Sequence, residues 1–436
     1  MRKVTTTREL TALAVPLALT QLAQVALTTT DTAMLGLLGV EALASGGLAM
    51  VIFNQFRTMG VGLVTAVGNQ VAAAHARRED LGDLVRAALA LATAAGVAGA
   101  ALMIAVGEGV ALLGQAPEVI DAMRPMLWAL APGLVPCLWF QAIRQFTVGM
   151  RRPQALLRIT LASIVVNLAL NLALMGSLGP AGIGLATSTV HLLTSIALYL
   201  SARRDPDLAP MLDLRAWRAR PATLRRLTGL GVPIAATYGS EAGFFSVVAL
   251  LVGTFGTAAL AAHTAVNQLV YIVFQISVGL SHAASIGVSR EVALGDPRQA
   301  RRIARAALAC GAVAMGVVAV LYVALPGLVL RPFLQPGDTT AMEIATGLLF
   351  VAAVMQFADC AQNIGVGLLR GVDDTKGGFR VTLVGYWLIG LPAAWLLAVP
   401  VGLDTLGTWL GLFTGLAATA ALLLARFRRT LAKVLQ

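Results

Sequence analysis

The chain has 436 residues, of which 58% are hydrophobic and 12% are charged, and its mean hydropathy is +0.81. Soluble domains carry about 25% charged residues, so this composition excludes a soluble globular domain. In a membrane protein, the net charge of +11 bears on which side of the bilayer the cationic residues lie. We therefore expect no nucleic-acid partner. Cys137, Cys310 and Cys360 lie apart in apolar runs, which argues against a disulfide framework or a cysteine metal site.

Runs of about 20 apolar residues, enough to cross a bilayer, recur along the whole chain. The first run is too long for a signal peptide, so we expect it to remain as a spanning helix. The predicted spans are residues 10–34, 43–68, 84–107, 122–146, 155–175, 181–201, 228–252, 259–283, 302–325, 342–367, 379–399 and 404–425.

This pattern predicts an all-α polytopic membrane protein with twelve transmembrane helices in two pseudo-symmetric six-helix bundles. We expect an amino-terminal lobe at 1–201, a basic linker at 202–227 and a carboxy-terminal lobe at 228–436. Of the 32 Lys and Arg residues, 28 fall in the two termini, the linker and every second loop. The positive-inside rule therefore predicts a multi-pass protein of the cell (inner) membrane, surrounded by lipids, with both termini in the cytoplasm.

The two halves share small residues at a common offset. A shift of 217 residues pairs Pro16 with Pro233, Gly36 with Gly253 and Gly39 with Gly256, and later a shift of 218 pairs Gly149 with Gly367. Each half has an even number of spans, so the repeat is parallel. Such a repeat implies a pseudo-twofold axis along the membrane normal and a cavity between two bundles, as in proteins that carry substrates by rocking two halves.

Three acidic residues, Asp31, Glu241 and Asp359, lie well inside apolar runs. A carboxylate at bilayer depth costs about 2.5–3.5 kcal/mol on insertion scales, and such groups usually serve ion or proton pathways. Glu241 and Asp359 together offer up to four oxygens, part of a possible sodium shell. The alternative is that each acid only forms a hydrogen bond to a neighbouring helix.

Polar side chains also recur at helical spacing. Asn167 and Asn171 share one face of the fifth span, and Gln141, Arg144 and Gln145 match Asp359, Gln362 and Asn363 at a shift of 218. Helix-to-helix packing alone is an alternative explanation for these amides. A substrate cavity is expected to draw on six polar or aromatic residues, each of which could instead be packing: Gln24, Gln141, Tyr238, Phe245, His263 and Tyr271.

The sequence contains no phosphate loop, no nucleophile and base in a recognisable arrangement and no metal-ligand cluster. We therefore expect neither an enzyme nor a cofactor. An intramembrane enzyme would need a nucleophile or a metal dyad at membrane depth.

The stretch Asp31-Thr32-Ala33-Met34-Leu35-Gly36, with Glu41-Ala42-Leu43-Ala44 after it, resembles the multidrug and toxic compound extrusion (MATE) transporters. The resemblance extends over nearly the whole chain, through Pro233-Ile234 and Leu369-Arg370-Gly371-Val372-Asp373-Asp374. Glu241 and Asp359 make the chain more similar to the NorM branch than to the DinF branch. Two departures from the expected pattern are Met355, in place of a tyrosine, and Arg57, in place of an apolar residue.

The resemblance implies export of drugs or toxic organic cations in exchange for sodium ions or protons. By position, Asp31, Asn167 and Asn171 would form an amino-terminal cation or proton site, and Glu241 and Asp359 a carboxy-terminal one. We expect a monomeric, cation-coupled multidrug antiporter that works by alternating access. A secondary transporter or flippase for one metabolite or lipid-linked intermediate is the alternative.

Overall fold

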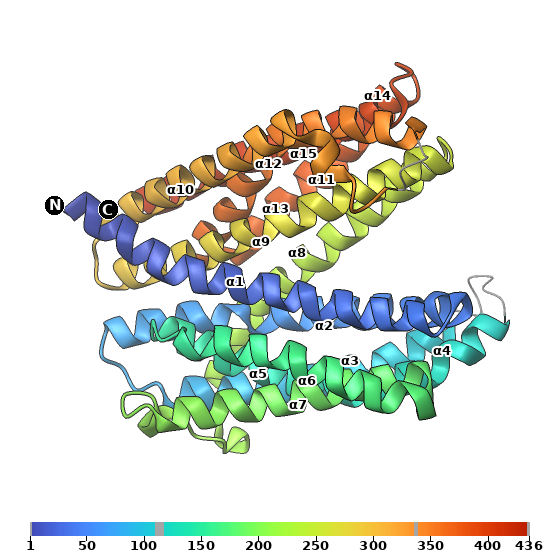
Figure 1. The fold of residues 1–436 in the computed structure, drawn as a ribbon. Helices are drawn as coiled ribbons and strands as arrows, with labels where there is room; N and C mark the ends of the chain where they lie inside the picture. The colour runs from blue at the N-terminus through green and yellow to red at the C-terminus, as the bar shows by residue number, and fades with distance from the viewer. Residues whose placement is uncertain (1, 110–116, 335–338, 434–436) are drawn as a thin grey trace. The chain divides into compact units, whose positions relative to one another are not determined.

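The computed structural model describes residues 2–109, 117–334 and 339–433. Within these ranges twelve helical segments are long and apolar enough to cross a membrane, which confirms the predicted number of spans. The helices, shown in Figure 1, are α1 (Arg2–Leu37), α2 (Val40–Ala76), α3 (Gly82–Gly109), α4 (Pro117–Leu130), α5 (Leu134–Gly149), α6 (Gln154–Leu178), α7 (Pro180–Arg204), α8 (Pro221–Gly253), α9 (Thr257–Ala293), α10 (Pro297–Ala324), α11 (Pro326–Leu330), α12 (Thr339–Gly371), α13 (Thr375–Leu383), α14 (Leu391–Ala398) and α15 (Asp404–Lys433).

Two of the predicted spans are not regular helices throughout. The fourth span consists of α4 and α5, joined by a tight 3₁₀ turn at Ala131–Gly133. Pro132 in this turn lacks the backbone N–H that an α-helix would need there. The eleventh span consists of α13 and α14, joined by a π-helical segment at Val384–Gly390. Neither irregularity shows in the hydropathy, because hydropathy reports the length of an apolar run and not its hydrogen-bond pattern.

The chain forms two compact units. One unit comprises Thr20–Tyr238, in which α5 packs against α2, α3 and α7, and α6 packs against α7. Its core contains Phe53, Met126 and Leu130, all almost fully buried. The helices of this unit are coloured blue to green in Figure 1.

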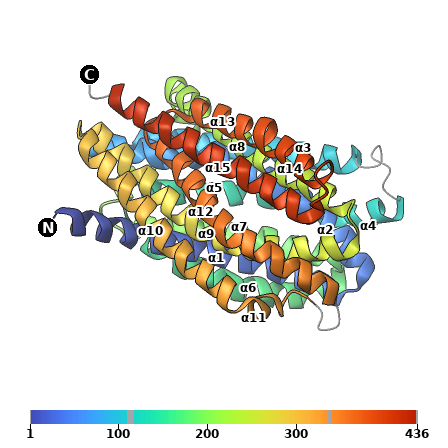
Figure 2. The same cartoon turned by 90° about the horizontal axis from the view of Figure 1, so that it is seen from above.

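The other unit comprises Met1–Leu19 and Gly239–Gln436. Its α12 packs against α9, α10 and α15, and α14 packs along α15 (Figure 2). Phe244, Tyr386 and Trp409 lie in its core. The beginning of α1 and the end of α15 lie at the same end of this unit, as an even number of spans requires. The lobe boundaries expected from the sequence stay a prediction.

The second helix of each half has the same length. α2 and α9 each contain 37 residues and begin 217 positions apart, as the predicted offset requires. Both follow a glycine with a positive φ, 113° at Gly39 and 108° at Gly256, a backbone conformation that L side chains rarely adopt. At about 1.5 Å per residue each helix is roughly 55 Å long, well beyond the hydrocarbon core.

The predicted pairing of Gly149 with Gly367 is wrong by one helical turn. A Cβ atom on Gly149 would meet Gly68 and Val71, whereas one on Gly371 would meet Ser285 and Val288, the residues 217 positions later. Gly149 therefore pairs with Gly371. The predicted match of Gln141, Arg144 and Gln145 to Asp359, Gln362 and Asn363 is therefore wrong as well. An alignment error of four residues is hard to detect from a sequence pattern, because residues four apart lie on the same face of a helix.

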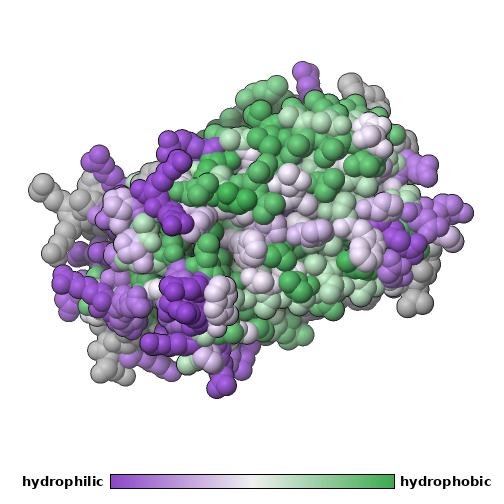
Figure 3. Space-filling model, turned by 90° about the horizontal axis from the view of Figure 1, so that it is seen from below, coloured by the Kyte–Doolittle hydropathy of each residue, from purple (hydrophilic) through white to green (hydrophobic). Residues whose placement is uncertain are grey.

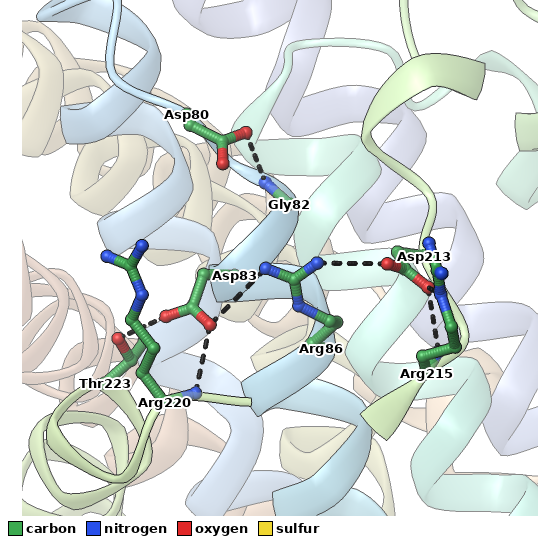
Figure 4. Close-up of polar contacts among 8 residues, drawn as sticks. All are labelled: Asp80, Gly82, Asp83, Arg86, Asp213, Arg215, Arg220 and Thr223. Atoms are coloured by element: carbon green, nitrogen blue, oxygen red, sulfur yellow. Dashed lines mark hydrogen bonds and ion pairs between the residues drawn. The ribbon is translucent and has the colours of Figure 1, made fainter. Parts of the chain in front are cut away.

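The linker between α7 and α8 is tied to the start of α3 (Figure 4). Asp83 accepts hydrogen bonds from the Arg220 backbone N–H at 3.0 Å and from the Thr223 hydroxyl, so it ties the start of α8 to α3. Arg86 joins Asp83 to Asp213 of the linker, with an Nη1–Oδ2 distance of 3.0 Å to Asp213.

Asp213 is also held by Arg215. Hydrogen bonds from the Arg215 side chain and backbone, with Arg86 adding to them, hold the pKa of the Asp213 carboxyl well below its usual range. A carboxyl group with a lowered pKa contributes stability above its unfolded pKa and loses it only as pH falls through the folded pKa. The linker contact therefore persists across the physiological pH range.

The surface separates by hydropathy along the helices. On the face in Figure 3, hydrophobic side chains gather over the middle of the helices and hydrophilic ones at their ends. Exposed apolar side chains such as Val165 of α6 and Leu250 of α8, 69% and 74% accessible, would be costly in water. This division is the one that a bilayer requires.

Close approach of α14 to α15 gives a test of the packing. A Cβ atom on Gly411 would lie 2.2 Å from the Cα and N atoms of Ala394. We expect Gly411→Val to destabilise the unit by about 1–3 kcal/mol, because backbone atoms cannot move aside as a side chain does. The yield of monodisperse protein in size-exclusion chromatography measures this loss. Gly316→Val in α10 is the control, since a Cβ there meets nothing within 4 Å, and equal yields for both variants would contradict the packing.

Candidate functional site: two buried carboxylate clusters

Asp31 lies in α1 and is fully buried. The Asn171 side-chain amide of α6 donates to its Oδ1 atom at 2.8 Å, and the Thr187 hydroxyl of α7 donates to its Oδ2 atom at 2.8 Å. Asn171 also donates to Asn167 Oδ1 at 3.1 Å. The structure thus places Asp31, Asn167 and Asn171 together and adds Thr187 to them.

Local sequence explains how three helices supply this cluster. Asn167 and Asn171 are four residues apart, so one turn of α6 puts both amides on the same face. Helical spacing does not explain the place of Thr187, which lies on another helix. Its Oγ1 atom is 3.0 Å from Ile183 O as well as 2.8 Å from Asp31 Oδ2, so its single proton can serve either acceptor. The Asn171 Oδ1 atom is buried and has no hydrogen-bond partner among the described residues.

A small cavity of about 50 Å³ lies beside this cluster, within the unit Thr20–Tyr238. Two of the six residues expected in a substrate cavity, Gln24 and Gln141, line it, and so does Asp31. At about 10–15 Å³ for each water molecule, it has room for a few groups of that size. Drug sites measure about 300–1,000 Å³, so in this conformation the cavity fits an ion or one functional group.

The cavity also contains the unexpected cation of the second span. Arg57 of α2 is half-buried, lines the cavity and donates from Nε to Asn54 Oδ1 at 3.1 Å. Arg144 of α5 is 2% accessible and donates from Nη1 to Gln141 Oε1 at 3.0 Å. Both contacts are to neutral amides rather than to carboxylates.

The carboxy-terminal acids form the second cluster, in the other unit. Glu241 of α8 and Asp359 of α12 interact electrostatically, and Asp359 is 6% accessible. Tyr386, in the π-helical segment, donates from its hydroxyl to Glu241 Oε1 at 3.4 Å and stacks on Phe244 with ring centroids 4.9 Å apart. Two carboxylates and one phenol hydroxyl therefore meet between α8, α12 and the π-helical segment.

The π-helical segment directs two successive side chains toward α8. Beside Tyr386, the Trp387 Nε1 atom donates to Ser240 Oγ at 2.9 Å. Met355, where the resemblance leads us to expect a tyrosine, is buried in the apolar core. Tyr386 supplies a hydroxyl to this cluster from another helix, and no pattern in the sequence pointed to it.

The other expected cavity residues lie elsewhere. His263 Nδ1 accepts a hydrogen bond from Trp409 Nε1 at 3.1 Å, so its ring already has a structural partner. Tyr271 is 46% accessible on α9. Tyr238 and Phe245 lie in α8, and neither lines the 50 Å³ cavity.

Within residues 2–109, 117–334 and 339–433, no group of three His, Cys, Asp or Glu side chains is arranged to hold a metal ion. The Glu241 cluster has two acids and one hydroxyl, and the Asp31 cluster has one acid with two amides and one hydroxyl. Such oxygen-rich, cysteine-free sets suit a proton or a weakly bound monovalent cation better than a transition metal.

Comparison with known proteins decides the family. The MatE family model matches residues 16–173 and 233–396, one segment in each half of the chain. The chain belongs to the MatE family.

MatE relatives match along almost the full length. A protein named multidrug resistance protein NorM from Pseudomonas aeruginosa is 36% identical over 97% of this chain and 89% of its own length. A NorM protein from Rhodopseudomonas palustris is 38% identical over 96% of this chain and 90% of its own. These matches confirm the resemblance to the NorM branch.

Solved structures of MatE proteins share the fold. An outward-facing multidrug resistance MATE transporter is similar with a TM-score of 0.91 and 15% identity, over 99% of this chain and 97% of that one. A eukaryotic MATE transporter gives a TM-score of 0.87 at 20% identity, over 99% of each chain. MatE membership confirms a multi-pass transporter, which is not an enzyme and needs no cofactor.

Proposed function

We propose that this protein is a cation-coupled antiporter that exports amphipathic organic compounds through the inner membrane by alternating access. The observation that carries the proposal is the full burial of Asp31 inside a shell of donors from α6 and α7. Relatives that cover the chain end to end and are named for multidrug resistance support the choice of substrates. Each half provides one carboxylate cluster.

Burial makes the ionised form of Asp31 costly in free energy. An ionised carboxylate away from water is costly unless its partners compensate, and here its partners are two neutral donors. Binding a cation or a proton removes the charge and so favours whichever conformation buries the group more completely. A ligand shifts a conformational equilibrium only by its difference in affinity for the two states, and a buried carboxylate creates such a difference.

The groups around Asp31 favour a proton over sodium at this cluster. A sodium ion needs oxygen lone pairs, whereas N–H and O–H donors occupy both Asp31 oxygens. When Asp31 is neutral, the Thr187 hydroxyl can accept the carboxyl proton from Oδ2 while it donates its own proton to Ile183 O. The Glu241 cluster, with two carboxylates and the Tyr386 hydroxyl, offers more oxygens to a cation.

We further infer that the termini and the linker lie in the cytoplasm and that the monomer is the working unit. The arginines of the linker and of the end of α15 support this orientation through the positive-inside rule.

Transport into proteoliposomes with proton and sodium gradients imposed separately tests the function. We expect accumulation of a fluorescent amphipathic dye to follow the proton gradient and to stop when an ionophore collapses it. The control is an empty liposome under the same gradient. Accumulation that ignores both gradients would contradict coupling, and competition limited to one chemical family would favour the alternative, a transporter for a single metabolite or lipid-linked intermediate.

A further inference from the structure

Arg57 is a charged side chain at membrane depth whose role the coupling clusters do not explain. It lies in the middle of α2, is half-buried and lines the 50 Å³ cavity with Asp31. On insertion scales an arginine at the centre of a membrane helix costs about 2.5–3.5 kcal/mol, so such residues are usually paired.

The pairing of Arg57 is incomplete. Its Nε atom donates to Asn54 Oδ1 at 3.1 Å, and no carboxylate forms an ion pair with its guanidinium in the part of the chain that the structure describes. A guanidinium has five N–H donors in a planar fork. The remaining N–H donors of Arg57, which lines the cavity, are therefore available to a group bound there.

The carboxylate of the cavity is already engaged. Asp31 is the one acid among the described residues that line it, and Asn171 and Thr187 take both of its oxygens. Gln141, another lining residue, accepts a hydrogen bond from buried Arg144 at 3.0 Å, so a second cation is bonded to the cavity lining. Two guanidinium groups thus act on one cavity that holds one carboxylate.

This imbalance favours an anionic group in the cavity. A bare organic cation would be repelled by Arg57, whereas a carboxylate matches the spacing of its N–H fork and forms charge-assisted hydrogen bonds. The polar groups of Thr28, Asn54 and His191 in the lining can orient such a group further. The volume suffices for a carboxylate with a water or two, but not for a whole drug.

We propose that Arg57 is the anion-recognising residue of the amino-terminal cavity and that it selects exported compounds bearing a carboxylate, such as zwitterionic amphiphiles. This inference rests on the proposed function and names a substrate class for it. It also changes the expectation from the sequence that the substrates are organic cations.

A pair of dyes that differ at one group tests the proposal. Rhodamine B carries a free carboxylate, and its ethyl ester carries only the positive charge. Fluorescence polarisation with purified protein in detergent gives the Kd of each dye without any gradient. We expect Arg57→Gln to raise the Kd of rhodamine B about tenfold, since hydrogen bonds to a charged group are lost, and to leave the Kd of the ester within about twofold.

Two further variants keep the result interpretable. Arg57→Lys retains the charge but not the fork, and we expect it to recover part of the affinity for the acid only. Arg124→Gln is the matched control, because that exposed arginine of α4 pairs with Glu108 and Asp121 away from the cavity. It should leave both Kd values unchanged.

An equal change for both dyes in Arg57→Gln would overturn the proposal, because it would mean that Arg57 only supports the fold. Tighter wild-type binding of the ester than of the acid would also overturn it. Because binding is measured without a gradient, these outcomes are separate from a failure of coupled transport in proteoliposomes, which would count against the proposed function instead.

Discussion

In Asp31→Asn, gradient-driven export falls roughly tenfold or more while the affinity for the exported compound stays near that of the wild type, if Asp31 is the coupling group. Asparagine keeps the shape of the side chain and can still form hydrogen bonds to Asn171 and Thr187. It cannot gain or lose a proton, so the two conformations no longer differ in their affinity for the driving ion. Uptake into inverted vesicles under an imposed gradient, at matched expression, measures the effect.

The control for Asp31 is another aspartate in the same unit. Asp121→Asn removes an exposed acid of α4 that pairs with Arg124, and it should transport at the wild-type rate. Wild-type transport by Asp31→Asn as well would mean that the carboxylate serves packing alone. The amino-terminal coupling site would then have to be withdrawn.

Glu241→Gln and Asp359→Asn are each expected to abolish drug resistance while the protein remains inserted and abundant. The two acids lie close enough to interact, so removing either one changes the charge that the other experiences and the number of oxygens available to a cation. Growth of a pump-deficient host across a drug dilution series measures resistance, and quantitative immunoblotting of membranes measures abundance.

Two neighbouring substitutions show whether this effect is specific. Glu343→Gln changes an exposed acid at the start of the same α12 helix and should leave resistance intact. Tyr386→Phe keeps the stack on Phe244 but removes the hydroxyl from Glu241, so we expect an intermediate loss. Full resistance in both acid variants would remove this cluster from the mechanism.

Hydropathy and charge were sufficient to predict the twelve spans, because a spanning helix satisfies its own backbone hydrogen bonds and needs only length and apolar character. The burial cost of a carboxylate likewise pointed to Asp31, Glu241 and Asp359, because each lies well inside an apolar run. Which residues surround each acid could not be predicted in this way. Thr187 and Tyr386 come from helices distant in sequence, and only the packing of helices decides such partners.

Only part of the internal repeat could be predicted from the sequence. Gly39 and Gly256 mark the same backbone conformation before α2 and α9, and a positive φ leaves a clear trace in sequence. The match of Gly149 to Gly371 gives a weaker sequence signal, because any small residue can occupy a close contact between helices. Apolar helices full of glycine and alanine therefore tolerate an error of one turn in their alignment.

The π-helical segment Val384–Gly390 has a consequence for how this lineage can vary. A π-turn holds one more residue than the α-turn that it interrupts, so it corresponds to the gain of a single codon within an otherwise regular helix. Loss of one codon there would return the span to a continuous α-helix and rotate Tyr386 and Trp387 by about 100° relative to α14. One in-frame deletion, with no change in the hydropathy of the span, would thus be enough to take the phenol away from Glu241.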